Sequence, residues 1–426
     1  MSIATTVLGA TDALAGAMGV LDRPLEAKPL LEKARRRSGH ADLGEWDVAA
    51  PLARLLDACA REAALSLLGR GALRWDVVRY ASNLLRLRAE ERACPNITAE
   101  PIASPIFITG LPRSGTTFLH RLMMEDPENR APRVFQTIHP YPDSSGGRDR
   151  REQRVNRQLY AFAQVAPEFR SLHPLEAASP QECCEITAHV FRSLRFDTTF
   201  HIPSYRGWLD EEGHLPAYRF HRRFLQHLQH QQGGGRFVLK CPDHLFALRE
   251  LRAVYPDARV VFVHRDPVKV LLSVSHLTEV LRRPFTRRVD RRRIGREESA
   301  RWYDGTLRMI QADAESPFAE PICHVHYLDL ISDPVSTVEG VYAHFGLTLA
   351  PEAASRMARL VAARPNGGYG QHSYRFEDHG LDAQAERDRF RGYMIHFGIE
   401  PEEARAGPAS PGSVPDALRS ARTGAG

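Results

Sequence analysis

The sequence has few cysteines, and no two of them stand in a Cys-x-x-Cys spacing. Only six cysteines are spread over 426 residues, and they do not cluster with histidines. This pattern predicts neither a zinc site nor a disulfide framework. The composition therefore fits a protein of the reducing cytoplasm.

Long apolar runs are also missing, so we expect no transmembrane segment. The stretch 1–20 is apolar, but it lacks an early Lys or Arg and carries Asp12, which favours a first amphipathic or buried helix over a signal peptide. Charge is nearly balanced, with 57 basic and 52 acidic residues and a net charge of +5. That excess is too small to indicate nucleic acid as a partner, and it leaves small anionic ligands as the simpler expectation.

The length allows one large α/β domain or two smaller ones. Residues 1–100 have apolar residues at helical spacing and predict a helical N-terminal region. From 101 to 400, apolar runs alternate with helical stretches, which we interpret as one catalytic domain. The segment 401–426 is rich in Pro, Gly, Ala and Ser and predicts a disordered tail.

Short, nearly continuous apolar runs predict strands at 105–109, 237–239 and 259–263, and a weaker one at 322–327. Strands of this kind, separated by helices, are typical of a parallel sheet covered on both faces. The predicted fold class is therefore three-layer α/β. In such sheets ligands bind beyond the carboxyl ends of the strands. The segments that follow three of the runs are Gly110–Thr117, Lys240–His244 and His264–Pro267.

The segment Gly110–Thr117 predicts a phosphate cradle between a strand and a helix, since the backbone N–H groups of such a loop point at one anion. The spacing of Gly110 and Gly115 is that of the nucleotide-binding P-loop. The lysine of that motif is replaced by Thr116, and the only cation in the loop is Arg113. The loop thus suits an anion other than a nucleoside triphosphate. Because its Lys-Ser/Thr ending and any compensating carboxylate cluster are absent, we expect no metal.

A second anion site is predicted after the run at 259–263. Arg265 follows that strand. Pro267 is tolerated only in the first turn of a helix, so a helix is predicted to begin here, and Ser273 lies two turns along it. An arginine can bind a phosphate through two hydrogen bonds, and a serine hydroxyl can complete the cradle. The alternative is an ion pair of Arg265 with Asp266 that caps the helix. Two anion sites at one sheet edge suit a nucleotide with phosphates at both ends.

Taken together, Pro112–Thr117 and the pair Arg265 and Ser273 resemble the two signatures of sulfotransferases that use 3′-phosphoadenosine-5′-phosphosulfate (PAPS). The resemblance continues through Lys240–His244 and 327–334 to about Ile399. It implies a P-loop-like fold and a set of residues for the sulfate donor. By this resemblance, the 5′-phosphosulfate is held by Arg113, Ser114, Gly115, Thr116 and Thr117, the 3′-phosphate by Arg265 and Ser273, and the adenine pocket lies near Tyr327.

Sulfuryl transfer requires charge neutralisation on the departing phosphate and a base for the acceptor hydroxyl. Arg113 fits the first role, and Lys240 is either a mobile cation for the bridging oxygen or a surface lysine beside Pro242. The candidate bases are His244, His139 and Glu182, in that order.

A departure from the bacterial relatives concerns the base. These relatives often carry a Trp-Glu pair after the first loop, where this chain has Phe135 and Gln136. A glutamine cannot accept the proton.

Two alternatives stay open at this point: a P-loop kinase or other NTPase with a degenerate loop, and a non-catalytic nucleotide- or glycan-binding protein. The acceptor would be a hydroxyl or amine on a small molecule, glycan or lipid, and the sequence does not identify it. We expect the segment from about 135 to 235 to shape its pocket. The arginine-rich stretch 282–296 is interpreted as a solvated helix or loop, or as a face toward an anionic substrate.

Overall fold

The computed structural model describes residues 12, 15–19, 21, 23–142, 149–165, 175–316, 318–363 and 375–402. The helix expected within 1–20 lies mostly outside these residues. So does the tail predicted from 401, except for Pro401 and Glu402.

Five parallel strands form the central sheet in the order β2-β3-β1-β4-β5. The strands are β1 (Ile106–Gly110), β2 (Asn129–Arg130), β3 (Arg236–Lys240), β4 (Arg259–His264) and β5 (Cys323–His326). β1 lies in the middle of the sheet, with Ile108 opposite both Lys240 and Val261. The four predicted strands and the three-layer α/β class are confirmed. β2 was not predicted, because two polar residues form no apolar run.

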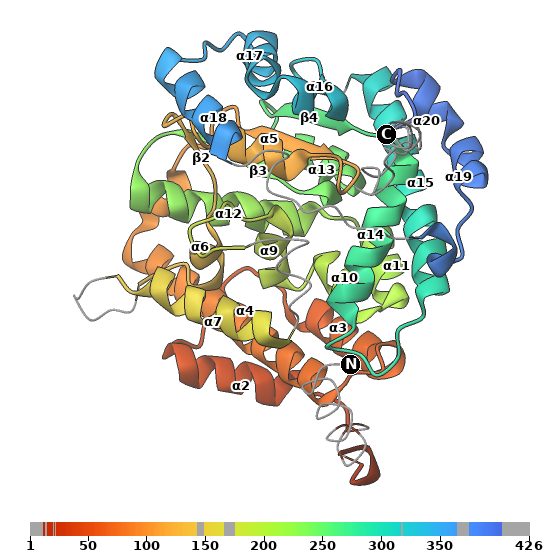
Figure 1. The fold of residues 1–426 in the computed structure, drawn as a ribbon. Coiled ribbons are helices and arrows are strands. Elements are labelled where there is room, and N and C mark those ends of the chain that lie inside the picture. The colour runs from red at the N-terminus through yellow and green to blue at the C-terminus, as the bar shows by residue number, and fades with distance from the viewer. Residues whose placement is uncertain are drawn as a thin grey trace, which may run out of the picture.

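Helices cover both faces of the sheet (Figure 1). Side chains alternate along β1, so Ile106 and Ile108 pack into one core and Phe107 into the other. On the first face lie α5 (Thr116–Met123), α16 (Tyr327–Ser332), α17 (Pro334–His344) and α18 (Pro351–Ala363). The opposite face is covered by α12 (Leu215–Gln232) and α13 (Leu248–Val254) and continues into the larger core.

The N-terminal region is helical, as predicted. Its elements are α2 (Ala27–Ser38), α3 (Ala49–Glu62), α4 (Leu67–Ala93) and the 3-10 helix η1 (Pro95–Ala99). In α4, 14 residues are buried, because the helix packs against α2 and against the segment that follows β2. The structure therefore joins this region to the larger core.

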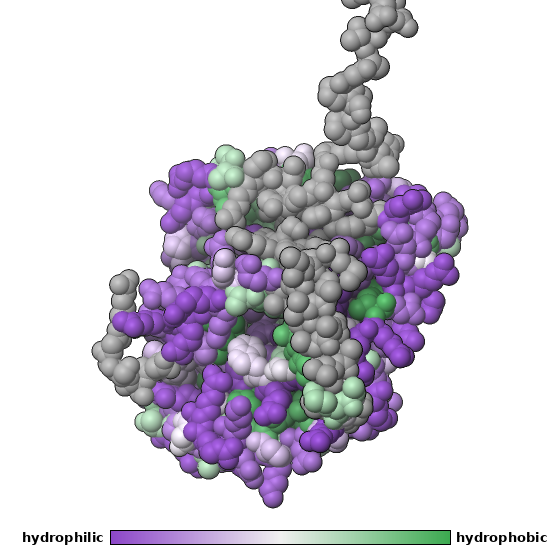
Figure 2. All heavy atoms as spheres, turned by 60° about the horizontal axis from the view of Figure 1, so that its bottom comes forward, coloured by the Kyte–Doolittle hydropathy of each residue, from purple (hydrophilic) through white to green (hydrophobic). Residues whose placement is uncertain are grey.

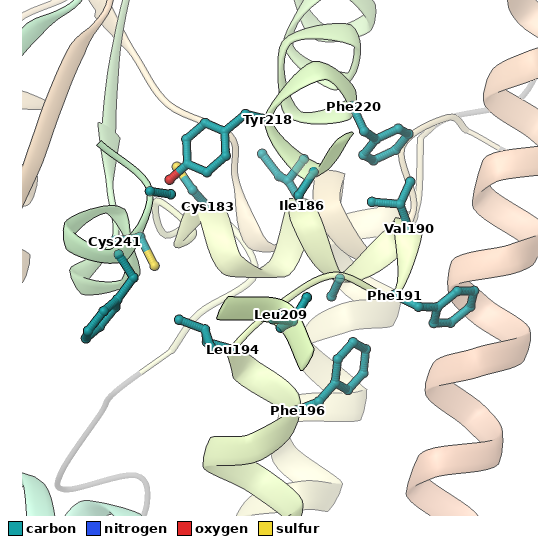
Figure 3. Close-up of a cluster of buried hydrophobic side chains, with 14 of the residues drawn as sticks. Cys183, Ile186, Val190, Phe191, Leu194, Phe196, Leu209, Tyr218, Phe220 and Cys241 are labelled. Atoms are coloured by element: carbon teal, nitrogen blue, oxygen red, sulfur yellow. The ribbon is translucent and has the colours of Figure 1, made fainter. Parts of the chain in front are cut away.

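The segment between β2 and β3 adds a helical layer below the sheet. Its shorter elements are α6 (Val134–Ile138), α7 (Arg151–Val165), α9 (Cys183–Thr187), η2 (Ala188–Val190), α10 (Arg195–Phe200) and α11 (Pro203–Glu212). Figure 3 shows the core that these helices share with α12, in which Ile186 and Phe220 lie on one side and Leu209 and Phe196 on the other.

The remaining elements follow β3 and β5. They are η3 (Pro242–Phe246), α14 (Pro267–Arg282), α15 (Arg291–Glu315), η5 (Phe376–His379), α19 (Ala383–Arg389) and α20 (Arg391–His396). Among the described residues, no helix combines the length and the apolar character needed to cross a membrane.

The arginine-rich stretch connects α14 and α15 and is only partly solvated. Arg282 is buried and donates to the carbonyl oxygens of Asp197 and Thr198 at 3.0 and 3.2 Å. Arg283 and Arg291 both bind the carboxylate of Glu279. These arginines hold α14 in place, whereas the other arginines of the stretch are exposed.

Candidate active site

The loop after β1 has the backbone geometry of a phosphate cradle. Gly110 has φ 143°, and a Cβ there would lie 2.3 Å from the carbonyl oxygen of Val263. Gly115 has φ 98°, and a Cβ there would lie 3.0 Å from the ring of Tyr327. Both positions require glycine, because a side chain would be strained and would collide with a neighbour. The loop then leads into α5, whose first N–H groups point beyond the sheet edge.

The two predicted anion sites are in direct contact. Nε of Arg113 donates to Oγ of Ser273 at 3.0 Å, and Nη1 of Arg265 donates to the carbonyl oxygen of Arg113 at 2.8 Å. Arg113 itself has a left-handed backbone, with φ 63°. The loop and the start of α14 thus form one cationic site rather than two separate ones.

The start of α14 differs from the capping alternative considered above. Asp266 caps the helix through Val268 N at 2.9 Å, but Arg265 does not pair with it. The Arg265 guanidinium instead binds the carboxylate of Glu402 and lies 3.8 Å from the centre of the Tyr327 ring. Arg265 is therefore held above the sheet edge by contacts on both sides.

Lys240 is not a surface lysine. It is 3% exposed and ends β3, next to β1, where its Nζ donates to Oγ1 of Thr117 at 3.1 Å and forms an ion pair with Glu182. The strand register thus brings a third cation to the phosphate loop, and Glu182 lies beside it.

A large cavity of about 1660 Å³ opens at this edge of the sheet. Of the residues predicted for the sulfate donor, it is lined by Arg113, Gly115, Thr116, Thr117, Arg265, Ser273 and Tyr327. Lys240 and Glu182 line it as well. The cavity then extends between the N-terminal helix α4 and helices α7, α10 and α14. On the face turned forward in Figure 2, hydrophobic side chains lie in a hollow with a mostly hydrophilic rim.

Three predicted site residues do not line this cavity. Ser114 is fully buried, and its hydroxyl donates to the carbonyl oxygen of Leu111 at 2.6 Å, so its side chain supports the loop from within. His139 follows α6 and also lies outside the lining.

His244, the first candidate base, is part of η3, and its side chain lies in the core. It is 2% exposed, bonds Tyr218 through Nδ1 and packs edge-on against Phe107. Burial holds the pKa of His244 well below its usual range, and His221 and Lys240 lower it further. The structure gives the imidazole no contact with the cavity, because the turn of η3 directs it inward.

Gln136, at the place of the glutamate of bacterial relatives, is a capping residue. Its Oε1 accepts from the backbone N–H of Arg133 at 2.9 Å at the start of α6, and the side chain is 1% exposed. It does not line the cavity.

Asp243 and Glu402 are among the acidic residues at the cavity that were not predicted from the sequence. Asp243 lies within the segment after β3 where ligand-binding residues were predicted, but the neighbouring His244 was the predicted base there. Glu402 falls in the predicted tail, where composition gave no sign of an ordered contact.

One group of possible metal ligands is present among the described residues. Oxygen and sulfur atoms of Glu182, Cys184 and Cys241 lie within 4.8 Å of one another. Burial raises the pKa of the Cys241 thiol, which disfavours the thiolate that a metal requires, and Glu182 is already paired with Lys240. This group therefore fits a metal poorly.

Comparisons with known proteins show the family to which this chain belongs. A family model described as sulfotransferase family matches residues 105–351, more than half of the chain. The chain therefore belongs to the sulfotransferase family, and it is an enzyme of the PAPS-dependent class. This membership favours the prediction from the two signatures over the kinase alternative.

Particular relatives are mycobacterial. Sulfotransferase STF1 from Mycobacterium tuberculosis H37Rv is 31% identical, with a TM-score of 0.76 over 86% of this chain and 99% of that chain. STF9 from Mycobacterium avium is 25% identical, with a TM-score of 0.80 over 88% and 98%. Omega-hydroxy-beta-dihydromenaquinone-9 sulfotransferase Stf3 from Mycobacterium bovis is 25% identical over 75% of this chain and 81% of its own length.

Proposed function

We propose that this enzyme transfers the sulfuryl group of PAPS to a hydroxyl group on an extended, largely apolar acceptor. The observation that supports this most is a single cavity with two unlike ends. One end is lined by the phosphate loop and its cations, and the other by apolar side chains of four helices.

The cationic end fits a single nucleotide with phosphates at two positions. Arg113, Arg265 and Lys240 supply positive charge, and Thr117 and Ser273 supply hydroxyls, and all five residues line one cavity. Charged N–H donors form stronger hydrogen bonds to phosphate than neutral ones. We assign the 5′-phosphosulfate to the loop and the 3′-phosphate to Arg265 and Ser273.

The roles in transfer follow from the same contacts. Arg113 carries a permanent charge and neutralises the departing phosphate. Lys240, placed on Thr117 at 3.1 Å, lies where an ammonium group can donate to the bridging oxygen. Glu182 keeps this ammonium in place through their ion pair. Glu182 is thus a positioning residue in this proposal.

Two of these four helices, α14 and α4, form opposite walls of the apolar end. On α14, Ser273, Leu277 and Leu281 line the cavity at a spacing of four residues, so the wall continues about 12 Å beyond Ser273. On α4, Leu68, Ala72 and other residues of one helix face form the opposite wall. This space is much longer than a sugar or phenol needs.

The acceptor class is therefore a hydroxyl at the end of a long apolar chain. The name of the relative Stf3 specifies an omega-hydroxylated dihydromenaquinone, which supports this class.

The test is transfer of 35S-labelled sulfuryl from PAPS to a panel of long-chain alcohols, isoprenoid alcohols, phenols and sugars. We expect label on the long apolar alcohols, with much lower kcat/KM for sugars. If adenosine 3′,5′-bisphosphate binds well and no member of the panel is labelled, the chain is a nucleotide-binding protein without this activity. Preferential labelling of sugars would contradict the acceptor class.

A further inference from the structure

The proposed reaction needs a proton acceptor at the cavity, and none of the imidazoles considered above faces it. The carboxylates that line it are Asp76, Glu182, Glu185, Asp243, Glu298 and Glu402. A general base needs a carboxylate oxygen that is open to the acceptor hydroxyl. The hydrogen bonds of each carboxylate therefore decide which of them can serve.

Most of these carboxylates already accept hydrogen bonds from protein groups through both oxygens. Asp76 and Glu185 each bind arginines through both oxygens, in a buried network with Arg79 and Arg195. Their charges are neutralised there, and they hold α4 against α9 and α10. This network is a wall of the cavity, not a base.

The oxygens of Glu298, Glu402 and Glu182 also contact protein groups. Glu298 accepts from Thr278 Oγ1 at 2.8 Å and from Trp302 Nε1 at 2.7 Å. Glu402 binds Arg265 through both oxygens. Glu182 pairs with Lys240 through Oε1, and its Oε2 lies 3.9 Å from the thiols of Cys184 and Cys241. Each of these three carboxylates therefore has both oxygens in contact with a donor.

Asp243 differs from all of them. Its Oδ1 accepts from Nη2 of Arg301 at 2.9 Å, and Oδ2 has no hydrogen-bond partner among the residues that the structure describes. The side chain is 22% exposed and faces the cavity. One oxygen is thus fixed by an arginine and the other is open.

The position of Asp243 is set by the sheet edge. It lies three residues after Lys240, and Oγ1 of Thr109 on β1 donates to the carbonyl oxygen of the intervening Cys241 at 2.9 Å. The turn is thereby anchored next to the phosphate loop. Asp243 and Lys240 thus project from the same strand end into one cavity.

We propose, on the basis of the proposed function, that Asp243 is the catalytic base and that Arg301 is its positioning residue. Asp243 Oδ2 takes the proton of the acceptor hydroxyl as the bond from the acceptor oxygen to sulfur forms. The bond from sulfur to the bridging oxygen breaks, and its electron pair leaves with adenosine 3′,5′-bisphosphate. The proton leaves Asp243 to solvent after the sulfate ester departs, so atoms and charge balance without a further reagent.

The surroundings of Asp243 suit this role. Burial raises the pKa of Asp243 to about 6, Arg301 opposes this, and the nearby acids Glu182, Glu298 and Asp197 raise it further. The charged group on the preceding strand end is Lys240, which is paired with Glu182. A base whose pKa lies near neutrality combines a high ionised fraction with proton affinity.

The test is the pH dependence of kcat/KM for Asp243→Asn, with a long-chain alcohol as acceptor. In the wild type we expect kcat/KM to rise with pH, with an inflection near pH 6. We call this rising part of the pH profile the limb. In Asp243→Asn we expect kcat to fall at least about 100-fold and the limb to vanish, with bisphosphate affinity within twofold. The matched control is Glu298→Gln, a carboxylate of the same cavity, which should keep the limb but move it to lower pH, because Glu298 raises the pKa of Asp243.

A second variant tests the positioning role. Arg301 lowers the pKa of Asp243, so Arg301→Met should move the limb to higher pH, a shift that a purely structural change would not cause. An Asp243→Asn enzyme with a rate within threefold of wild type would overturn the proposal. So would loss of the limb in Glu182→Gln but not in Asp243→Asn. A wild type that transfers to no acceptor would overturn the proposed function itself, and the base assignment with it.

Discussion

Glu402 holds the guanidinium of Arg265 in a two-point ion pair, with Nε to Oε1 at 2.7 Å and Nη2 to Oε2 at 2.9 Å. The backbone N–H of Glu402 is itself fixed by Oδ2 of Asp266 at 2.8 Å. A carboxylate thus occupies the fork of the arginine assigned to the 3′-phosphate. The sulfate donor has to displace it, because both anions need the same N–H groups.

Glu402→Gln should therefore strengthen binding of adenosine 3′,5′-bisphosphate. A neutral amide competes less well for the guanidinium than a carboxylate, and we expect affinity to rise by about 1 kcal/mol, roughly fivefold. Isothermal titration calorimetry measures this. Glu400→Gln is the control, since Glu400 is exposed and its loss removes the same charge. Equal or weaker binding by Glu402→Gln would contradict the displacement.

Substitutions of the two arginines at the sheet edge should have different effects. Arg113→Ala removes the cation of the phosphate loop and should abolish transfer. Arg265→Ala should mainly weaken bisphosphate binding, by about 2–4 kcal/mol for a lost charged contact. Calorimetry together with single-turnover rates separates the two effects. Unchanged bisphosphate affinity in Arg265→Ala would contradict the 3′-phosphate assignment.

Filling the apolar end of the cavity with a larger side chain should weaken binding of the acceptor and leave binding of the nucleotide unchanged. Ala72 lies on the α4 wall of the cavity, so Ala72→Phe shortens the space available to a long chain. We expect KM to rise at least about tenfold for a long-chain alcohol, while bisphosphate affinity stays unchanged. A short alcohol is the internal control, because it does not reach α4. Equal effects on both alcohols would mean that the apolar part of the long-chain alcohol binds elsewhere.

Buried neutral histidines should make the fold sensitive to acid. Burial lowers the pKa of His120 and of His221 to about 3, whereas the unfolded chain titrates near 6.5. Between these values the unfolded state binds more protons, so the free energy of unfolding falls as pH decreases from about 6.5. Each such histidine contributes up to about 1.4 kcal/mol per pH unit.

The measurement is the free energy of unfolding in urea between pH 7.5 and 5. His221→Gln cannot titrate, so its stability should decline less steeply with decreasing pH. An unchanged slope in this variant would show that His221 protonates in the folded state.

Much of the fold could be predicted because buried parallel strands leave a direct signal. The runs at 105–109 and 259–263 are apolar on both faces, and the phosphate loop and Arg265 follow them directly. β2 left no such signal, since its pairing of Asn129 with Arg236 depends on a neighbouring strand far along the chain.

The direction of side chains after a strand was harder to predict. His244 and Asp243 are adjacent, and only the 3-10 turn that begins at Pro242 decides which of them faces the cavity. The contact of Glu402 with Arg265 spans 137 residues, so composition near the C-terminus could not indicate it.

We assign the loop at Arg113 and the start of α14 together to a nucleotide with phosphates at its 3′ and 5′ positions. The most direct measurement is the melting temperature with adenosine 3′,5′-bisphosphate in the presence of a chelator, compared with ATP and magnesium. We predict a clear rise with the bisphosphate that is lost in Arg265→Ala, and little change with ATP. A larger rise with magnesium and ATP than with the bisphosphate would contradict this assignment.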